Sequence, residues 1–471
     1  MDAKLVAGYV SSGSDFSKLP DVAAAAGLED KEVNMIRYVV SAAAADLKEA
    51  LTAEKPSDSR RAIEKIAKDL SVGAERITAF VDEVRSGLGL LETVVDRSAL
   101  VLNNIGNNTY LGLGGLIFKP SKDDAAVFDM VRYTGEGGDV RIPAKVRIKD
   151  IVYRVECVAE NTFRNTKVES VKIPEGCLRI ETGAFDGCEL LKSVTIPASL
   201  ERIEHGAFKK CKSLERFEVV EGNKEFRADG YGILYTKDGK FLLQAPGALE
   251  GSVVLPEGLG VVSDTAFWGC SKVTEVSIPS GTKRIGKSAF SGCSSIARMR
   301  LPASIVEIGD FAFNGCSSLV SIDMEAGGDR FASEDGVLYT RDMSTLVRAP
   351  GKIGKDVRIR DGVETIGNGA FQGCEDMRSV TMGPSVRKVS DDAFKGCISL
   401  ETVSFGPSVE SIGKYAFMGC VMLEGVNVPD SARSVGTWAF GECKSLRKAS
   451  VPASLELLPT VFPQEAEIER R

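Results

Sequence analysis

The sequence predicts an α+β protein in which a small α-helical bundle precedes a long repeat solenoid. The first observation is a motif, Ala-Phe followed by two variable residues and Cys, that occurs nine times between Ala184 and Cys443. Directly neighbouring copies place their cysteines 23 residues apart, and a fixed period of this length is typical of coils that stack into a solenoid. The second observation is the helical spacing of apolar residues near the N-terminus. We therefore predict a helical bundle over residues 1–100, a linker over 101–124 and a solenoid over 125–471.

The N-terminal bundle is predicted from three amphipathic stretches. Apolar residues recur at helical spacing from Val33 to Leu51, from Ile63 to Leu70 and from Ile77 to Leu91. A three-helix unit of this size also fits a helix-turn-helix that reads DNA. Residues 1–100, however, contain 13 Lys and Arg against 17 Asp and Glu, and DNA affinity depends on neutralising phosphates. We interpret the segment as a packing or docking bundle that does not bind nucleic acid.

The predicted linker contains two turn signals. Asn103–Asn108 is rich in asparagine and predicts a turn, and Gly112–Gly115 predicts a second turn or a bulge. The glycines are not followed by Lys and Ser or Thr, and they lack the strand-to-helix context of a dinucleotide-binding loop. We therefore expect no nucleotide cofactor here.

The repeat unit is clearest from Leu191 to Leu214. Val194 and Ile196 alternate with polar residues, which predicts a strand with one buried face. Pro197 lacks an N–H group and ends that strand, and a second apolar pair follows on the return path. The Ala207-Phe208 pair then fits a short helical or turn segment that fills the centre of the coil.

Counting these strand triplets predicts about thirteen coils. The triplets start at Val140, Val171, Val194, Phe217, Val253, Val276, Met299, Ile322, Val357, Val380, Val403, Val426 and Ala449. Two longer coils carry inserts, around Tyr231–Leu243 and Gly336–Pro350, that we expect to be β-hairpins standing out from one flank. The first insert has an Asp238-Gly239 turn, a strong hairpin signal. The second has Asp342-Met343 instead, which leaves its turn type open.

The repeat unit, the Gly-Ile-Leu-Tyr and Gly-Val-Leu-Tyr sequences of the two inserts and the opening segment from Gly138 to Phe163 resemble the BspA-like leucine-rich repeats over residues 125 to 462. The resemblance implies a curved scaffold for protein or surface binding, often on secreted or cell-surface proteins. The N-terminus predicts a different location. Residues 1–20 have no basic segment followed by an apolar core, and no run of about 18 apolar residues could span a membrane. From these features we expect a cytoplasmic protein without membrane insertion.

Cysteine usage agrees with that expectation. Nine of the eleven cysteines occupy one repeat position, so we predict a ladder of buried, reduced thiols that pack as small hydrophobic groups. Side chains stacked in parallel do not meet disulfide geometry. A metal or redox role is the alternative. Cys157 and Cys177 lie outside the ladder and have no assignment.

Catalytic residues are not predicted. The only histidine, His205, occupies a variable repeat position that should face solvent. A single histidine leaves one candidate base for a nucleophilic pair and excludes a multi-histidine metal site. We therefore expect no enzymatic activity, no cofactor and no metal.

The candidate binding residues come from the strand pattern. The outer two residues of each triplet should face the core, so the middle residue and the one before the triplet point outwards. This pattern exposes Ser277, Arg298 and Arg300 between the two inserts, and Arg358 beyond the second. Aromatic residues and Arg are enriched in interface hot spots. We expect hairpins around Tyr235 and Tyr339 to stand as two ridges beside the Arg pair. The alternative is that both hairpins fold down over the solenoid edge.

Two classes of function remain open. The first is a protein-binding scaffold in which the solenoid holds a partner and the bundle docks elsewhere. The second, implied by the resemblance, is an adhesin-like surface protein exported without a secretory signal. The sequence specifies neither the partner nor the oligomeric state.

Overall fold

A computed structural model describes residues 65, 92–94, 101–105, 108–113, 115–122, 124, 126–148 and 151–471. Within residues 1–100 the structure describes only Lys65 and the short strand β1 (Glu92–Val94), so the helices expected there lie outside the described residues. The chain divides into two compact units. The first contains the described residues up to Gly135, with Arg141–Val158 and Lys172–Leu178, and the second contains Glu136–Val140, Ala159–Val171 and Arg179–Arg471.

The first unit is built on a mixed sheet with the strand order β1-β7-β8-β5-β4-β3-β2. Its other strands are β2 (Val101–Ile105), β3 (Asn108–Leu113), β4 (Leu116–Pro120), β5 (Val127–Tyr133), β7 (Lys145–Ile148) and β8 (Ile151–Val158). Strands β2 to β5 pair antiparallel in sequence order. The segment expected to be a linker therefore contains three strands. Each turn signal spans the end of one strand and the approach to its antiparallel partner, from β2 to β3 and from β3 to β4.

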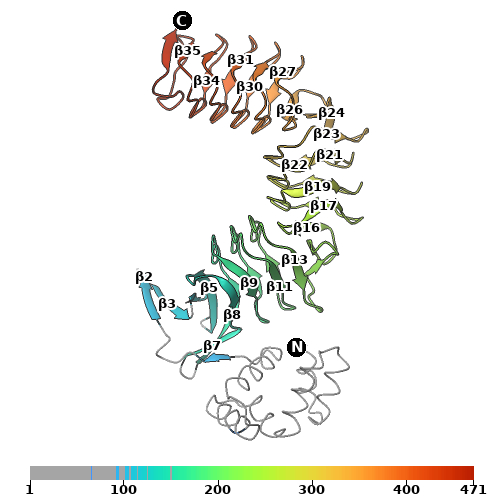
Figure 1. Ribbon diagram of the computed structural model, residues 1–471, viewed down its shortest axis with the longest axis vertical. Coiled ribbons are helices and arrows are strands. Elements are labelled where there is room, and N and C mark those ends of the chain that lie inside the picture. Colours follow the sequence, from blue (N-terminus) through green and yellow to red (C-terminus); the bar gives the residue numbers. More distant parts are fainter. Residues whose placement is uncertain are drawn as a thin grey trace. The chain divides into compact units, whose positions relative to one another are not determined.

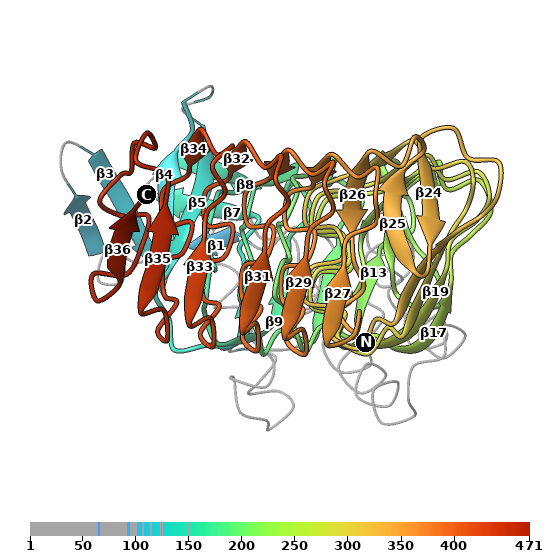
Figure 2. The ribbon, with the colours of Figure 1, turned by 90° about the horizontal axis from the view of Figure 1, so that it is seen from above.

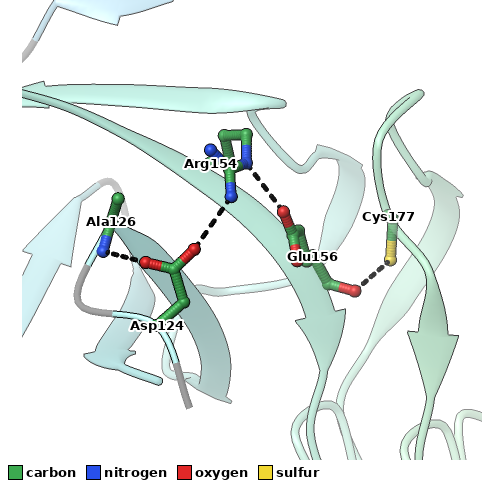
Figure 3. A network of polar contacts seen from close by, with 5 residues as sticks. All are labelled: Asp124, Ala126, Arg154, Glu156 and Cys177. Carbon is green, nitrogen blue, oxygen red and sulfur yellow. Dashed lines mark hydrogen bonds and ion pairs between the residues drawn. The ribbon is translucent and has the colours of Figure 1, made fainter. Parts of the chain in front are cut away.

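A polar network lies on this sheet (Figure 3). Arg154 contacts Asp124 at 3.0 Å and Glu156 at 2.7 Å, and the hydrogen bond and charge of Glu156 raise the pKa of Arg154. The Asp124 carboxylate also accepts the Ala126 N–H at 2.8 Å. The Cys177 thiol donates to the Glu156 carbonyl at 3.6 Å. Cys177, unassigned from the sequence, thus has a main-chain partner.

The second unit is a solenoid of parallel coils (Figure 1). The first residue of each predicted triplet lies in a strand on the outer face of the solenoid, and one further strand follows at the C-terminal end. These outer strands are β6 (Gly138–Arg141), β9 (Val168–Lys172), β11 (Ser193–Ile196), β13 (Arg216–Val219), β17 (Glu250–Val254), β19 (Lys272–Ser277), β21 (Arg298–Leu301), β23 (Ser321–Met324), β27 (Asp356–Arg358), β29 (Ser379–Thr381), β31 (Thr402–Ser404), β33 (Gly425–Asn427), β35 (Lys448–Val451) and β36 (Glu467–Arg470). Figure 2 shows β27, β29 and β31 side by side, with the parallel pairing that joins them.

Nine of the coils return through a strand of two residues. These return strands are β10 (Arg179–Ile180), β12 (Arg202–Ile203), β18 (Val261–Val262), β20 (Arg284–Ile285), β22 (Glu307–Ile308), β28 (Thr365–Ile366), β30 (Lys388–Val389), β32 (Ser411–Ile412) and β34 (Ser434–Val435). Neighbouring return strands pair in parallel, as β18, β20 and β22 do. The second residue of most return strands is buried, which confirms the apolar position expected on the return path.

The two inserts are part of the return face of the solenoid. The first comprises β14 (Phe226–Ala228), β15 (Leu234–Thr236) and β16 (Phe241–Gln244), and the second β24 (Phe331–Glu334), β25 (Val337–Thr340) and β26 (Thr345–Arg348). Each insert is antiparallel within itself. Strands β16 and β26 then pair in parallel with β18 and β28. The expectation that the hairpins stand out from a flank is therefore corrected, because their last strands continue the solenoid sheet.

Both inserts use the same turn. Gly239 has a φ of 73° and Met343, at the equivalent place, has a φ of 61°. The preceding aspartate fixes the loop: Asp238 accepts the Thr236 hydroxyl at 2.7 Å, and Asp342 accepts the Thr340 hydroxyl at 2.6 Å. These hydrogen bonds lower the pKa of both carboxyl groups. The aspartate contacts are thus the same whether Gly239 or Met343 takes the left-handed position.

The Ala-Phe motif forms turns whose phenylalanine rings stack along the core. Ring centroids of Phe371, Phe394 and Phe417 lie 4.8 and 4.9 Å apart. The turns are linked along the stack, because the Phe290 N–H donates to the Ala312 carbonyl of the next coil at 2.8 Å. The ring stack is interrupted at each insert, where the coil lacks the motif.

The ladder cysteines have a specific hydrogen-bonding role. All eleven cysteines are buried and none forms a disulfide. The Cys293 thiol donates to the Phe267 carbonyl of the preceding coil at 3.1 Å. Seven of the nine ladder thiols, Cys293 included, donate in this way to the phenylalanine carbonyl of the coil before their own. The two that follow inserts use Pro246 and Pro350 instead. Each of these carbonyls also accepts a main-chain N–H, as Phe267 does from Cys270 at 3.1 Å. The thiol is therefore a second donor to the carbonyl, which a methyl group could not provide.

The residue before each Ala-Phe pair has a left-handed backbone. Several coils use glycine there, but Thr265 has a φ of 60° and its hydroxyl oxygen is buried without a partner. Because a β-branched residue is strained in this region, we expect Thr265→Gly to stabilise the protein by about 1 kcal/mol. Urea denaturation would measure the change. Thr274→Gly, in the middle of β19, is the control and should lower stability; a loss in both variants would contradict the strain argument.

Candidate functional site

Three of the predicted contact residues line one groove on the outer face. Ser277 at the end of β19, and Arg298 and Arg300 on β21, lie around a groove of about 380 Å³. Both arginines are exposed to solvent, whereas Met299, which lies between them in the sequence, is 1% exposed. The predicted alternation of buried and exposed residues is confirmed on this strand. The other lining residues are Thr274, Glu275, Val276, Ile278, Ala297, Pro302 and Glu325.

The groove lies at a seam in the outer face. Strands β17 and β19 form one two-stranded sheet, and β21 and β23 form another, without a ladder between β19 and β21. The sequence does not indicate this seam, because the triplets that start at Val276 and Met299 are separated by the usual 23 residues. Glu275 and Glu325 contribute negative charge to the same groove. The surface therefore presents both signs of charge next to exposed strand edges.

The two arginines in this groove have no ion pair among the residues that the structure describes. Asp323 lies opposite Arg300 in the strand register. Its carboxylate accepts the Ser321 hydroxyl at 2.8 Å instead. By contrast, Arg284 on the return face contacts both Asp264 and Glu307 at 2.9 Å. The guanidinium groups of β21 thus remain available to groups outside the chain.

Tyr235 and Tyr339 are not placed as expected. Tyr235 is 0% exposed and Tyr339 is 6% exposed, because β15 and β25 are the middle strands of their inserts. The Tyr235 hydroxyl donates to Asp229 at 2.9 Å, and burial raises the pKa of both tyrosines. The hairpins do not form exposed tyrosine ridges. Instead, the last strand of each insert joins the return sheet.

Arg358 lies outside the groove. It is exposed on β27, which begins the separate sheet β27-β29-β31 after the second insert. It therefore shares the outer face with Arg300 without sharing its pocket.

Side chains that could support chemistry are sparse in the described part of the chain. His205 is exposed, as expected from its variable position. Across the described residues, no group of three or more His, Cys, Asp or Glu side chains is arranged to hold a metal ion. These residues also contain no helix with the length and apolar character that a membrane crossing requires.

Stacked parallel coils, a phenylalanine and cysteine core and an open outer face define a leucine-rich-repeat solenoid. The chain belongs to the BspA type leucine rich repeat family: the family model for this repeat region matches in six copies over residues 148–230, 249–334 and 353–466, more than half of the chain. The resemblance found in the sequence is thereby confirmed. A comparison with curated proteins gave no match.

Three similar solved structures are of bacterial proteins. A leucine rich cell surface protein from Faecalibacterium prausnitzii is 25% identical, with a TM-score of 0.51, and the match covers 78% of this chain and 95% of that one. The pneumococcal vaccine antigen PcpA is 18% identical over 77% of this chain and 88% of its own, with a TM-score of 0.41. A leucine-rich repeat protein from Eubacterium ventriosum is 18% identical over 78% of this chain and 98% of its own, with a TM-score of 0.40.

The comparison bears on the expected location. The Faecalibacterium prausnitzii protein is described as a cell surface protein. The cytoplasmic location expected from residues 1–20 has no support from this match and stays a prediction.

Proposed function

We propose that this chain is a non-enzymatic scaffold that binds another protein through the outer face of its solenoid. The observation that carries the proposal is the unpaired, exposed arginine pair on β21, which borders a groove at a seam in the sheet. Arginine combines a planar donor group with weak hydration and is enriched in interface hot spots. Membership in a repeat family also supports it, since extended solenoid surfaces are used for binding.

The contact surface is centred on Arg298, Arg300 and Ser277. Tyr235 and Tyr339 are not part of it, because a partner cannot reach their buried rings. Arg358 extends the surface along the outer face in this proposal.

The double change Arg298→Ala with Arg300→Ala should weaken partner binding at least about tenfold, since hot-spot truncations typically cost more than 1 kcal/mol each. Both side chains are exposed and unpaired, so the melting temperature should stay the same. Arg378→Ala with Arg433→Ala, two exposed arginines away from the groove, is the matched control. Biolayer interferometry with the identified partner would measure affinity; equal loss in both double variants would move the site elsewhere.

A second candidate function is an adhesin-like role at the cell surface. The match to a cell surface protein over 95% of its length favours it. The test is fractionation of the native host together with protease treatment of intact cells. Digestion on intact cells would support the surface role, and protection until lysis would support a cytoplasmic scaffold.

A further inference from the structure

The second insert holds a charged side chain inside the solenoid. Arg348, the last residue of β26, is 5% exposed. Its guanidinium donates to the main-chain carbonyls of Gly369, of Phe313 at 3.1 Å and of Gln372 at 3.1 Å. Its Nε atom has no hydrogen-bond partner among the residues that the structure describes. No carboxylate forms an ion pair with it in the described chain.

A pocket of about 180 Å³ lies beside this side chain. The pocket lies where the return sheet is interrupted. Strand β22, paired with β20, ends one sheet, and β26 pairs with β28 in the next sheet. Arg348, Phe311 and Phe313 line it. The pocket therefore combines a buried cation with the end of a broken hydrogen-bond ladder.

That broken ladder leaves backbone donors unused. In the preceding coil, the N–H groups of Ser288 and Phe290 donate to the Asp310 and Ala312 carbonyls of the next coil, at 3.0 and 2.8 Å. The equivalent N–H groups of Phe311 and Phe313 have no acceptor among the described residues. By repeat equivalence they point along the stack, towards the coil that contains Arg348.

The local charges do not neutralise Arg348. Carbonyl groups satisfy its hydrogen bonds but carry no net charge, and a buried ion without a counter-charge is strongly destabilising. Asp310 is the acidic residue in the pocket lining; it is exposed, and its carboxylate lies 3.5 Å from the Asn368 amide nitrogen rather than at Arg348. The described residues therefore give Arg348 hydrogen-bond acceptors without a counter-charge.

The first insert shows that the fold does not need this charge. Gln244 occupies the equivalent place, because Gln244 pairs with Leu234 as Arg348 pairs with Leu338. Gln244 is also buried, at 6% exposure, and donates to the Ala245 and Ala266 carbonyls. A neutral amide thus fills the same structural position, so the charge of Arg348 calls for a separate explanation.

We propose that the pocket beside Arg348 binds a small oxyanion. The Arg348 Nε–H and the Phe311 and Phe313 N–H groups supply donors, and charge-assisted hydrogen bonds to oxyanions are among the stronger ones in proteins. The ligand is either a free phosphate-like ion or the carboxylate of an acidic side chain from a partner. This site is separate from the groove at β21 and does not depend on the proposed function.

Isothermal titration of the full chain with inorganic phosphate and with acetate, at constant ionic strength set with chloride, tests the proposal. Wild type should bind at least one of these anions at a single site. Tighter binding of phosphate would identify a free oxyanion as the ligand, and tighter binding of acetate a carboxylate. Arg348→Gln copies the first insert and should weaken binding by at least about tenfold.

Two further variants keep the test decisive. Arg348→Lys retains the charge but loses the Nε donor, so it should bind more weakly than wild type even if Arg348→Gln does not fold. Arg378→Gln, at an exposed arginine outside both the pocket and the groove, should bind as wild type does. Absence of binding by wild type, or unchanged affinity in the Arg348 variants, would overturn the proposal.

Discussion

Phe290→Ala should destabilise the protein by about 3–5 kcal/mol. Phe290 is 0% exposed and stacks between Phe267 and Phe313, with ring centroids 5.0 and 5.8 Å away. Removing the ring creates a cavity in the centre of a coil and deprives both neighbouring rings of a contact. Chemical denaturation would measure the free energy of unfolding.

The exposed ring of Phe241 provides the matched control. It is 43% exposed at the start of β16, so Phe241→Ala should change stability by no more than about 0.5 kcal/mol. Because a coil contacts only its neighbours, hydrogen exchange in the Phe290 variant should rise first around Phe267 and Phe313. Equal, small effects of both substitutions would show that the phenylalanine stack is not the core.

The ladder thiols should be almost unreactive in the folded protein. Burial raises the pKa of Cys188 to about 11 and that of Cys270 and Cys316 to about 12, from 9.0. The thiolate is the reactive form, so each unit of pKa reduces its population about tenfold at neutral pH. Ellman titration should find all eleven thiols in denaturant and almost none, on the same timescale, in the native state.

The same shifts make stability depend on pH. A thiol with a raised folded pKa contributes stability that is fully present below its unfolded pKa and is lost as pH rises towards the folded value. For Cys270 and Cys316 that window runs from about pH 9 to about pH 12. Unfolding free energies that stay constant across this window, or rapid native labelling of most thiols, would contradict the buried ladder.

Much of the solenoid could be predicted because its repeat carries the same physical signal many times. Val194 and Ile196 alternate with polar residues, and the strand that they predict is β11. Each later triplet repeats that pattern, so one correct interpretation places all the outer strands except β36. The ladder thiols followed from their shared register, although their donation to the Phe carbonyls could not be foreseen from spacing.

The inserts could be predicted only in part. An Asp-Gly pair between apolar runs indicates the hairpin, yet the direction in which it leaves the coil depends on pairing between β16 and β18, far along the chain. Because this pairing could not be foreseen, Tyr235 and Tyr339 were expected on exposed ridges, whereas both are buried. The seam beside β21 and the pocket beside Arg348 also arise from interrupted pairing, which has no local sequence pattern.

The central claim, that the face around β21 holds a protein partner, has one direct test. A photoreactive amino acid at Ser277 should cross-link the partner in host extract, whereas the same group at Ser404, the exposed last residue of β31, should not. The Ser277 product should disappear when Arg298 and Arg300 are also changed to Ala. Equal cross-linking from both positions, or a product unaffected by the loss of the arginines, would contradict the account.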